Sequence, residues 1–217
     1  MSFDRKKYLQ PSKLCDFDRS PALRKKAQEL AAGCSNREEK FREVFIFVKE
    51  LPYGLEDWDV KASQILSKGW GMCSGKTNLL VALLRCLGIA ARYRIYQFKA
   101  DMALWQRFGN ESGKAARINE LGEIRDHVDC EVWLGKWIDC DPSRDTAMEQ
   151  GMLKLGGSLE RRKVTDQKGR VKYLRLSVFD QWVRERQGRR AFRSDRVNVF
   201  AQINSGFEQL REFGRSD

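Results

Sequence analysis

Two stretches near the start of the chain carry apolar residues at helical spacing. In residues 21–32 and 36–50 the apolar side chains recur every three or four positions, which gives each helix one apolar face. Pro21 stands where a helix tolerates a missing N–H, and Gly33 is placed to end the first helix. A third, shorter helix is predicted over residues 60–68.

The segment Cys73–Leu87 is apolar with hardly a polar break. A helix with apolar residues on every side must be buried nearly all round, so we predict a buried helix here. Gly88 follows as its stop signal, and residues 91–98 then alternate as in a half-buried strand. Residues 99–125 are loop-like, with a helical turn predicted near 102–108.

Two strands joined by a tight turn, 127–133 and 137–141, are predicted next, and a largely helical, arginine-rich tail follows them. Strict alternation places His127, Asp129 and Glu131 on one face of the first strand, with the apolar residues between them on the other. The hairpin therefore separates a polar face from an apolar one.

The turn of this hairpin decides which residues face one another. A two-residue turn would send Asp141 to the face opposite His127, whereas a three-residue loop, 134–136, would pair Asp129 with Asp141. The second register gathers the apolar side chains on one face and the acids with His127 on the other, so it is the register that we predict. Asp141 then lies diagonal to His127, within reach of a hydrogen bond.

This register sets acid against acid, because Asp129 faces Asp141 and Glu131 faces Asp139. Like charges directly opposite one another destabilise a sheet, so we expect basic side chains, with the tail as one source, to cover this face. The same group of one histidine and four carboxylates could instead hold a divalent cation through oxygen ligands. A purely structural hairpin is the third interpretation.

The chain, with 217 residues of which 41% are hydrophobic, is long enough for one sizeable core. We expect a core with N-terminal helices over residues 1–145 and a basic, mostly helical extension over residues 146–217 packed on it. No stretch approaches the ~20 apolar residues of a membrane span, and the charged N-terminus is unlike a signal peptide. Six cysteines without a CxxC pair favour reduced thiols, no metal and a cytoplasmic protein.

The formal net charge of +11 lies mainly in the tail, where residues 151–217 hold 16 Lys and Arg against 8 Asp and Glu. Such a balance suits nucleic acid, an acidic partner or simple solubility. No nucleic-acid-binding motif accompanies it to decide between these.

Cys73 stands at the start of the apolar helix, directly after Gly69-Trp70-Gly71-Met72. A helix start lowers the pKa of a thiol from ~8.5 toward neutrality by placing unpaired N–H groups beside the sulfur, so we expect Cys73 to be a nucleophile. Alternatively, Cys73 is just a small residue at a helix start, or Gly75-Lys76-Thr77 ends a phosphate-binding loop. That loop needs four residues between its glycines, and this chain offers five or three.

The chain contains a single histidine, His127, so a thiol nucleophile with an imidazole base would have to use it. Asp141 would then fix the tautomer of His127 and stabilise its charged form. The candidate catalytic residues are therefore Cys73, His127 and Asp141.

Taken together, these segments resemble the transglutaminase-like superfamily. The resemblance rests on Gly71-Met-Cys73-Ser-Gly-Lys-Thr with its apolar helix, on His127, and on Glu131-Val-Trp-Leu-Gly-Lys-Trp-Ile-Asp-Cys-Asp141-Pro142. The order cysteine, histidine, aspartate is the order of that family. The resemblance covers about residues 7–145, with Ser143 in place of a frequent threonine.

The resemblance implies a papain-like α+β fold, with the nucleophile helix packed on an antiparallel sheet, and acyl chemistry without a cofactor. The substrate would be a peptide, a protein or a small amide. The candidate oxyanion donors are Trp70, Tyr53 and the backbone N–H of Cys73. Residues 99–125 are a candidate lid or a plain surface loop. The rival interpretation is a non-catalytic binding module of the same fold that engages protein or nucleic acid through its basic tail.

Overall fold

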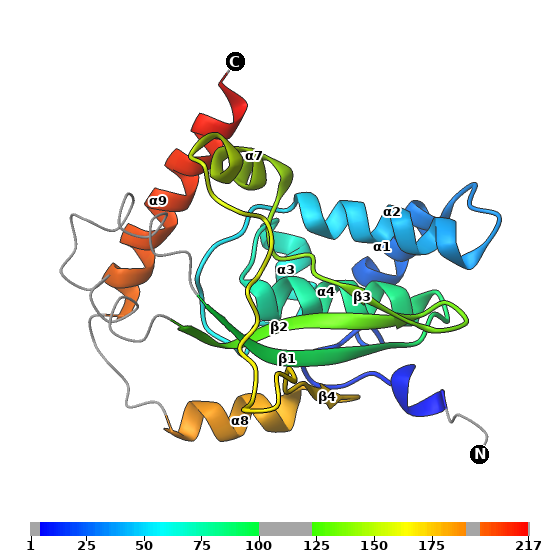
Figure 1. Ribbon diagram of the computed structural model, residues 1–217. Coiled ribbons are helices and arrows are strands. Elements are labelled where there is room, and N and C mark those ends of the chain that lie inside the picture. Colours follow the sequence, from blue (N-terminus) through cyan, green and yellow to red (C-terminus); the bar gives the residue numbers. More distant parts are fainter. Residues whose placement is uncertain (1–4, 100–122, 190–195, 217) are drawn as a thin grey trace.

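The computed structural model describes residues 5–99, 123–189 and 196–216. Helices α1 to α4 lie together on one side of an antiparallel sheet (Figure 1), so the α+β fold predicted from the sequence is confirmed. Residues 100–122, with the predicted helical turn and most of the candidate lid, lie outside the described residues. The elements are η1 (Lys6–Tyr8), α1 (Pro21–Ala31), α2 (Arg37–Glu50), α3 (Ala62–Lys68), α4 (Cys73–Cys86), β1 (Ala91–Lys99), β2 (Glu123–Trp133), β3 (Trp137–Cys140), α7 (Thr146–Lys154), β4 (Leu174–Leu176), α8 (Asp180–Arg189) and α9 (Arg196–Arg215).

The first two helices begin at side-chain caps. The hydroxyl of Ser20 accepts a hydrogen bond from the N–H of Leu23 at the start of α1, and the side chain of Asn36 accepts one from Glu39 at the start of α2. The first N–H groups of a helix have no acceptor within the helix, and these two side chains accept hydrogen bonds from them. The predicted helices over 21–32 and 36–50 are confirmed within one residue at each end.

Helix α4 is the centre of the core. Every residue from Cys73 to Arg85 is buried, as the apolar pattern predicted. The helix packs on the face of β2 that presents Val128, Cys130 and Val132, all of which are fully buried. One end of α4 is thereby held against the strand that carries His127.

The sheet has the strand order β3-β2-β1-β4, and its three strand pairs are antiparallel. Between β2 and β3, Cys130 pairs with Cys140 and Trp133 with Trp137, so the hairpin has the three-residue loop that its patterning predicted. β4 comes from the C-terminal part of the chain and pairs with β1. Residues beyond 146 therefore extend the sheet as well as forming helices.

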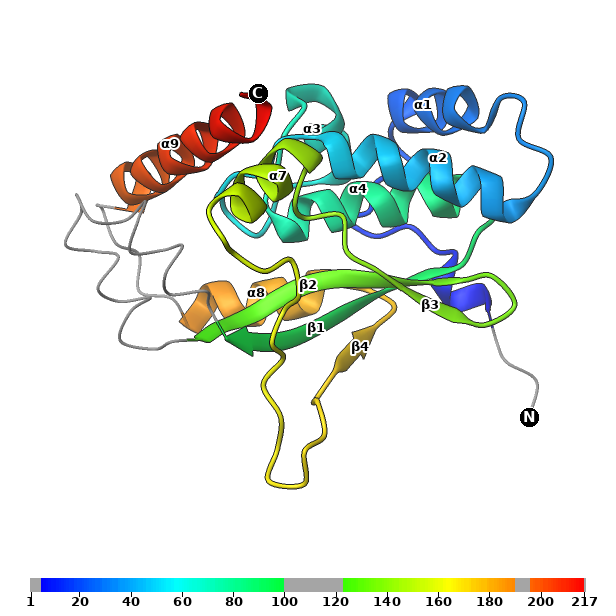
Figure 2. The same ribbon diagram turned by 45° about the horizontal axis from the view of Figure 1, so that its top comes forward.

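Helices α7 and α9 form a pair beside the other helices (Figure 2). Their backbones touch at two glycines: a Cβ added at Gly151 or Gly214 would lie 2.0 Å from a carbonyl oxygen of the partner helix. α8 instead adds Trp182, which packs against Trp58 and Phe179 in the main core. None of the helices in the described part of the chain has the length and apolar character needed to cross a membrane.

Candidate active site

The start of α4 is fixed by a buried acid and by two glycines. The carboxylate of Glu56 accepts a hydrogen bond of 2.9 Å from the N–H of Met72, the residue directly before the helix. A Cβ added at Gly75 would lie 2.5 Å from Cδ1 of Ile65, and one added at Gly71 would lie 2.8 Å from the same atom. The Gly-Met-Cys-Ser-Gly segment thus allows the helix start to sit tightly against α3 and Glu56.

Lys76 ties the first turn of α4 to two other segments. Its side chain is fully buried, and Nζ donates hydrogen bonds to the carbonyl oxygens of Lys49 (2.9 Å), Leu51 (2.5 Å) and Ser143 (3.1 Å). An ammonium group has three donors, and all three are used here. A phosphate-binding role for Gly75-Lys76-Thr77 is therefore wrong, in agreement with the spacing of the glycines.

Cys73 lies beside the open edge of β2, just beyond the end of β3. Thr77 on α4 donates a hydrogen bond of 3.3 Å to the carbonyl oxygen of Val128, and the backbone N–H of Val128 lowers the pKa of the Cys73 thiol. β3 ends at Cys140, so the carbonyl oxygen of Val128 is hydrogen-bonded to a side chain of α4 and not to β3. The nucleophile candidate is therefore next to the residue that follows His127.

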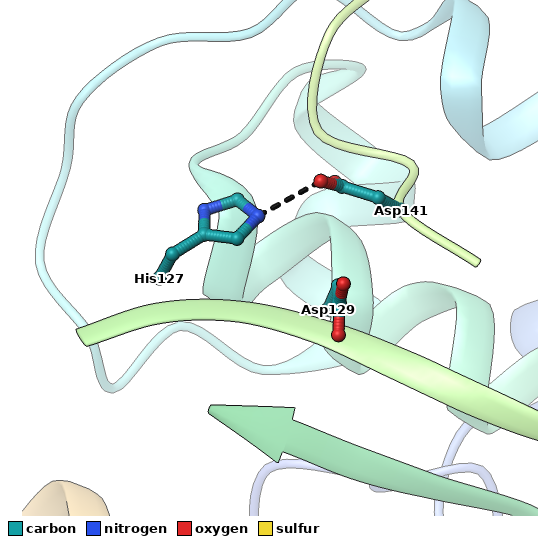
Figure 3. A group of neighbouring side chains, drawn as sticks. All are labelled: His127, Asp129 and Asp141. Atoms are coloured by element: carbon teal, nitrogen blue, oxygen red, sulfur yellow. Dashed lines mark hydrogen bonds and ion pairs between the residues drawn. The ribbon is translucent and has the colours of Figure 1, made fainter. Parts of the chain in front are cut away.

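His127 and Asp141 are joined directly. Nε2 of His127 lies 2.9 Å from Oδ2 of Asp141, as the predicted register requires (Figure 3). Oδ1 of the same carboxylate accepts a hydrogen bond of 3.0 Å from the N–H of Ser143. The imidazole is buried, with its ring edge-on to Tyr96 at 5.1 Å and to Phe98 at 5.3 Å. If Nε2 carries the proton that faces the carboxylate, Nδ1 is left as the proton acceptor.

Arg161 completes the surroundings of the carboxylate, and sequence reasoning did not single it out. Its Nη1 lies 2.6 Å from Oδ2 of Asp141, and its Nη2 donates a hydrogen bond of 2.7 Å to the hydroxyl of Ser143. The patterning predicted that basic residues, with the tail as one source, would cover this face, but the tail has many arginines and nothing in their spacing distinguishes this one.

A family model for the transglutaminase-like superfamily matches residues 24–142, more than half of the chain. The chain belongs to the transglutaminase-like superfamily. Among solved structures, this transglutaminase-like chain is similar to a protein from Cytophaga hutchinsonii described as a "putative cysteine protease", with 20% sequence identity and a TM-score of 0.51. The match covers 81% of this chain and 57% of the other, so the chain spans little more than half the length of that protein. This likeness supports the fold alone. A comparison with curated proteins found no match.

The thiol of this transglutaminase-like site corrects the expectation of a lowered pKa. Burial raises the pKa of Cys73 to about 12, and the charge of Asp141 adds to the increase. The N–H groups of Val128 and Ser74 and the charge of Arg161 act in the opposite direction but do not outweigh burial. The helix-start argument considered only the favourable dipole and omitted the loss of water around a sulfur in the core.

His127 is held neutral and Asp141 is held ionised. Burial lowers the pKa of His127 below its ordinary value, and the nearby charge of Arg161 lowers it further, against the opposing effect of Asp141. Burial also acts to raise the pKa of Asp141, but the charge that His127 carries when it is protonated, the charge of Arg161 and the hydrogen bonds to the carboxylate hold that pKa well below its usual range. Near neutral pH, the resting pair is therefore a thiol and a neutral imidazole.

The acidic face of the hairpin is covered by arginines, as the patterning predicted. Arg94 of β1 forms two hydrogen bonds with Asp129, at 2.8 and 2.7 Å, and also pairs with Asp139. Glu131 is bound by Arg92, also of β1, and by Arg175 of β4. β1, which is next to β2, and β4, which lies beyond β1, thus supply the counter-charges, together with Arg161.

The residues of the candidate cation site are close enough to share an ion, but their carboxylate oxygens already have partners. One ligand atom each from His127, Asp129 and Asp141 lies within 4.8 Å of the others. However, Asp129 is occupied by the fork of Arg94, and Asp141 by Arg161 and His127. Oxygen ligands that already neutralise a guanidinium are poor ligands for a divalent cation, so these residues do not fit a resident metal.

A pocket of about 450 Å³ adjoins the site on the outer face of the sheet. Asp141 and Arg161 line it, and neither Cys73 nor His127 is among its lining residues. The sulfur of Cys73 is itself almost fully buried, with 5% of the residue exposed. The remaining lining residues are Arg94, Tyr96, Asp129, Asp139, Cys140, Glu160, Arg162 and Lys163.

The two side chains proposed as oxyanion donors are placed differently. Residues 52–54 run beside Gly71, so both Tyr53 and Trp70 are near the start of α4. Burial raises the pKa of the Tyr53 hydroxyl well above its ordinary value, and the charge of Cys73 adds to this. Trp70 packs against Gly54 and carries the ammonium of Lys68 over its ring at 4.0 Å. Of the two, Tyr53 is the better candidate.

Proposed function

We propose that the protein is a thiol-dependent enzyme that attacks an amide or acyl bond with Cys73, using His127 as the base and Asp141 to orient it. One observation carries the proposal: the only histidine of the chain is hydrogen-bonded to Asp141 at 2.9 Å, and the residue after it, Val128, is hydrogen-bonded to the helix that begins with Cys73. A nucleophile, a base and an acid that orients the base are what nucleophilic catalysis by a thiol requires.

The first half of the reaction forms a thioester. Nδ1 of His127 takes the thiol proton as the sulfur of Cys73 attacks the carbonyl carbon, which gives a tetrahedral intermediate with a charged oxygen. The imidazolium then returns its proton to the nitrogen of the leaving amine, the carbon–nitrogen bond breaks, and a thioester remains. In the second half, water or an amine attacks the thioester and restores the thiol.

Asp141 supports both halves of this cycle because its carboxylate stays ionised. It fixes the tautomer in which Nε2 carries a proton and stabilises the imidazolium while it exists. The charged oxygen of the intermediate would be bound by the backbone N–H of Cys73 and by the hydroxyl of Tyr53, which remains protonated and can donate.

The resting thiol is compatible with this mechanism. A pKa of about 12 means that almost no free thiolate exists near neutral pH, so the proton must move to His127 as the attack takes place. Cys73 and His127 thus act as a thiol and its general base, and not as a preformed ion pair of thiolate and imidazolium. The substrate class we propose is a peptide, a protein or a small amide, and the cytoplasmic location stays a prediction.

The rival function is a binding module that keeps the fold without catalysis. The observation that favours it is the near-complete burial of the sulfur, which a binding module would tolerate and an enzyme must overcome when substrate arrives. Its basic tail would then hold a protein or a nucleic acid.

Replacing Cys73 by Ala separates the two functions, with Cys86→Ala as the matched control because Cys86 lies at the far end of the same helix. A panel of fluorogenic amides and acyl esters is tested for turnover by both variants, and each is tested for binding to heparin and to single-stranded RNA. An enzyme loses turnover only in Cys73→Ala. Turnover that survives in Cys73→Ala contradicts the proposal, as does a chain that binds the polyanions and turns over no member of the panel.

A further inference from the structure

Arg161 reaches the site from the segment between α7 and β4, well beyond the hairpin that carries His127 and Asp141. Its guanidinium is fixed by three contacts: Oδ2 of Asp141 at 2.6 Å, the hydroxyl of Ser143 at 2.7 Å and the ring of Phe98 at 5.3 Å. Only 14% of the side chain is exposed. Ordering a long side chain in this way costs side-chain entropy, and the charged contact with Asp141 must offset that cost.

The contact has an electrostatic consequence for the base. Arg161 and Nε2 of His127 share one oxygen, Oδ2 of Asp141. A permanently charged partner keeps the carboxylate ionised but also offsets part of the negative charge that His127 would otherwise feel. The same positive charge favours the thiolate of Cys73. Arg161 therefore makes the imidazole a weaker base and the thiol a stronger acid.

We propose that Arg161 is a positioning residue of this site, which holds Asp141 as a carboxylate and weakens His127 as a base. The inference rests on the proposed function and assigns part of the site to the C-terminal extension, outside the residues 24–142 that match the family. Arg161 acts through Asp141 and His127 and is not itself placed on the reacting atoms.

Other titratable and charged groups around His127 also affect its pKa. Asp129 shares the strand, Asp141 follows β3, Cys73 begins α4, and Arg144 adds a positive charge from the segment before α7. Tyr96 of β1 contributes a ring whose hydroxyl stays protonated. The hydrogen bonds of Asp129 with Arg94, and the contacts of Arg144 with Leu159 and Glu149, do not involve Arg161. The change at residue 161 is therefore the one that alters the charge beside Asp141.

The test uses the fact that His127 is the only histidine, so that a protein without added histidines gives a single imidazole signal in an NMR titration. The signal is followed from pH 4 to 8 in the wild type, Arg161→Gln and Arg161→Lys. Arg162→Gln is the matched control, because Arg162 is the next residue, is exposed and lines the same pocket. Alkylation of Cys73 by iodoacetamide is measured on the same samples by peptide mapping, with the more exposed Cys34 and Cys86 as internal references.

We expect the midpoint of the His127 titration to rise by about one pH unit in Arg161→Gln, since a nearby positive charge has been removed. Arg161→Lys keeps the charge and should stay within a few tenths of a unit of the wild type, and Arg162→Gln should not change. If Arg161→Gln does not fold, Arg161→Met keeps the packing on Phe98 and carries the same expectation.

An unchanged or lower midpoint in Arg161→Gln overturns the inference, because a merely structural arginine would release Asp141 and leave His127 less basic. The proposed function fails separately: it is contradicted if alkylation of Cys73 in the wild type is independent of the His127 titration, whatever the position of its midpoint. The two readouts thus distinguish failure of the inference from failure of the function.

Discussion

Replacing Arg94 by Met should destabilise the protein strongly, and more so at high pH. Arg94 and Asp129 are almost fully buried and share two hydrogen bonds of 2.8 and 2.7 Å. Two unit charges about 4 Å apart at an effective dielectric constant of about 20 attract one another by about 4 kcal/mol. Breaking a buried pair typically costs about 3–5 kcal/mol, because the remaining charge is left without compensation. We expect a loss in this range from the free energy of unfolding at pH 8.5.

The pH dependence follows from the carboxyl group that is left behind. Burial raises the pKa of Asp129 to about 7, although Arg94 opposes the increase. An unfolded chain releases this proton near about pH 3.9. Between that pH and about pH 7 the folded protein holds a proton that the unfolded chain has lost, so the contribution of Asp129 to stability falls as the pH rises. Without Arg94 the pKa of Asp129 rises further, so the free energy of unfolding continues to fall up to a higher pH.

The assay is urea denaturation followed by tryptophan fluorescence at pH 5.5 and pH 8.5. The loss in Arg94→Met should be small at pH 5.5, where Asp129 is protonated in both proteins, and large at pH 8.5. Adding Asp129→Asn should recover most of the loss, because no buried charge is then left. Arg170→Met, which breaks an exposed pair with Asp166, is the control and should leave the urea midpoint nearly unchanged. A loss below about 1 kcal/mol in Arg94→Met at pH 8.5, or an equal loss at both pH values, would refute the reasoning.

Three further predictions concern the start of α4. Gly75→Ala should cost about 1–3 kcal/mol in urea denaturation, because its Cβ would lie 2.5 Å from Ile65; a stabilised variant would contradict the packing. Lys76→Met leaves three carbonyl oxygens without their donor, so the midpoint of thermal unfolding should fall by several degrees, and an unchanged midpoint would mean that water replaces the ammonium. The rate of alkylation of Cys73 should rise above about pH 10, because burial raises the pKa of its thiol to about 12. An alkylation rate that is constant from pH 8 to 11 would count against this.

The hairpin and the central helix could be predicted from the sequence because their patterns admit few alternatives. A one-residue slip of the hairpin would mix apolar and acidic side chains on both faces, so the three-residue loop between Trp133 and Trp137 was the only register that separated them. The run from Leu79 to Leu84 was equally decisive, since a helix apolar on all sides has to be buried.

Other features depend on tertiary packing that no local pattern encodes. The three residues of β4 are too few to show an alternation, and they form a strand by pairing with β1 on the side away from β2. Nothing in its sequence context distinguishes Arg161 from the other arginines of the tail. Only the path of the chain from α7 to β4 brings it to Asp141. The pKa of Cys73 was predicted in the wrong direction because a helix start reveals the dipole but not the depth of burial. The division of the chain at residue 145 stays a prediction.

The most direct test of the proposed triad is site-resolved labelling with an electrophilic glutamine-like probe near neutral pH, read by mass spectrometry in the wild type and in His127→Ala. The triad predicts that the probe modifies Cys73 in preference to the more exposed Cys34 and Cys86, and that this preference disappears in His127→Ala. Equal labelling of Cys73 in both proteins, or labelling in the wild type that follows exposure alone, would contradict it.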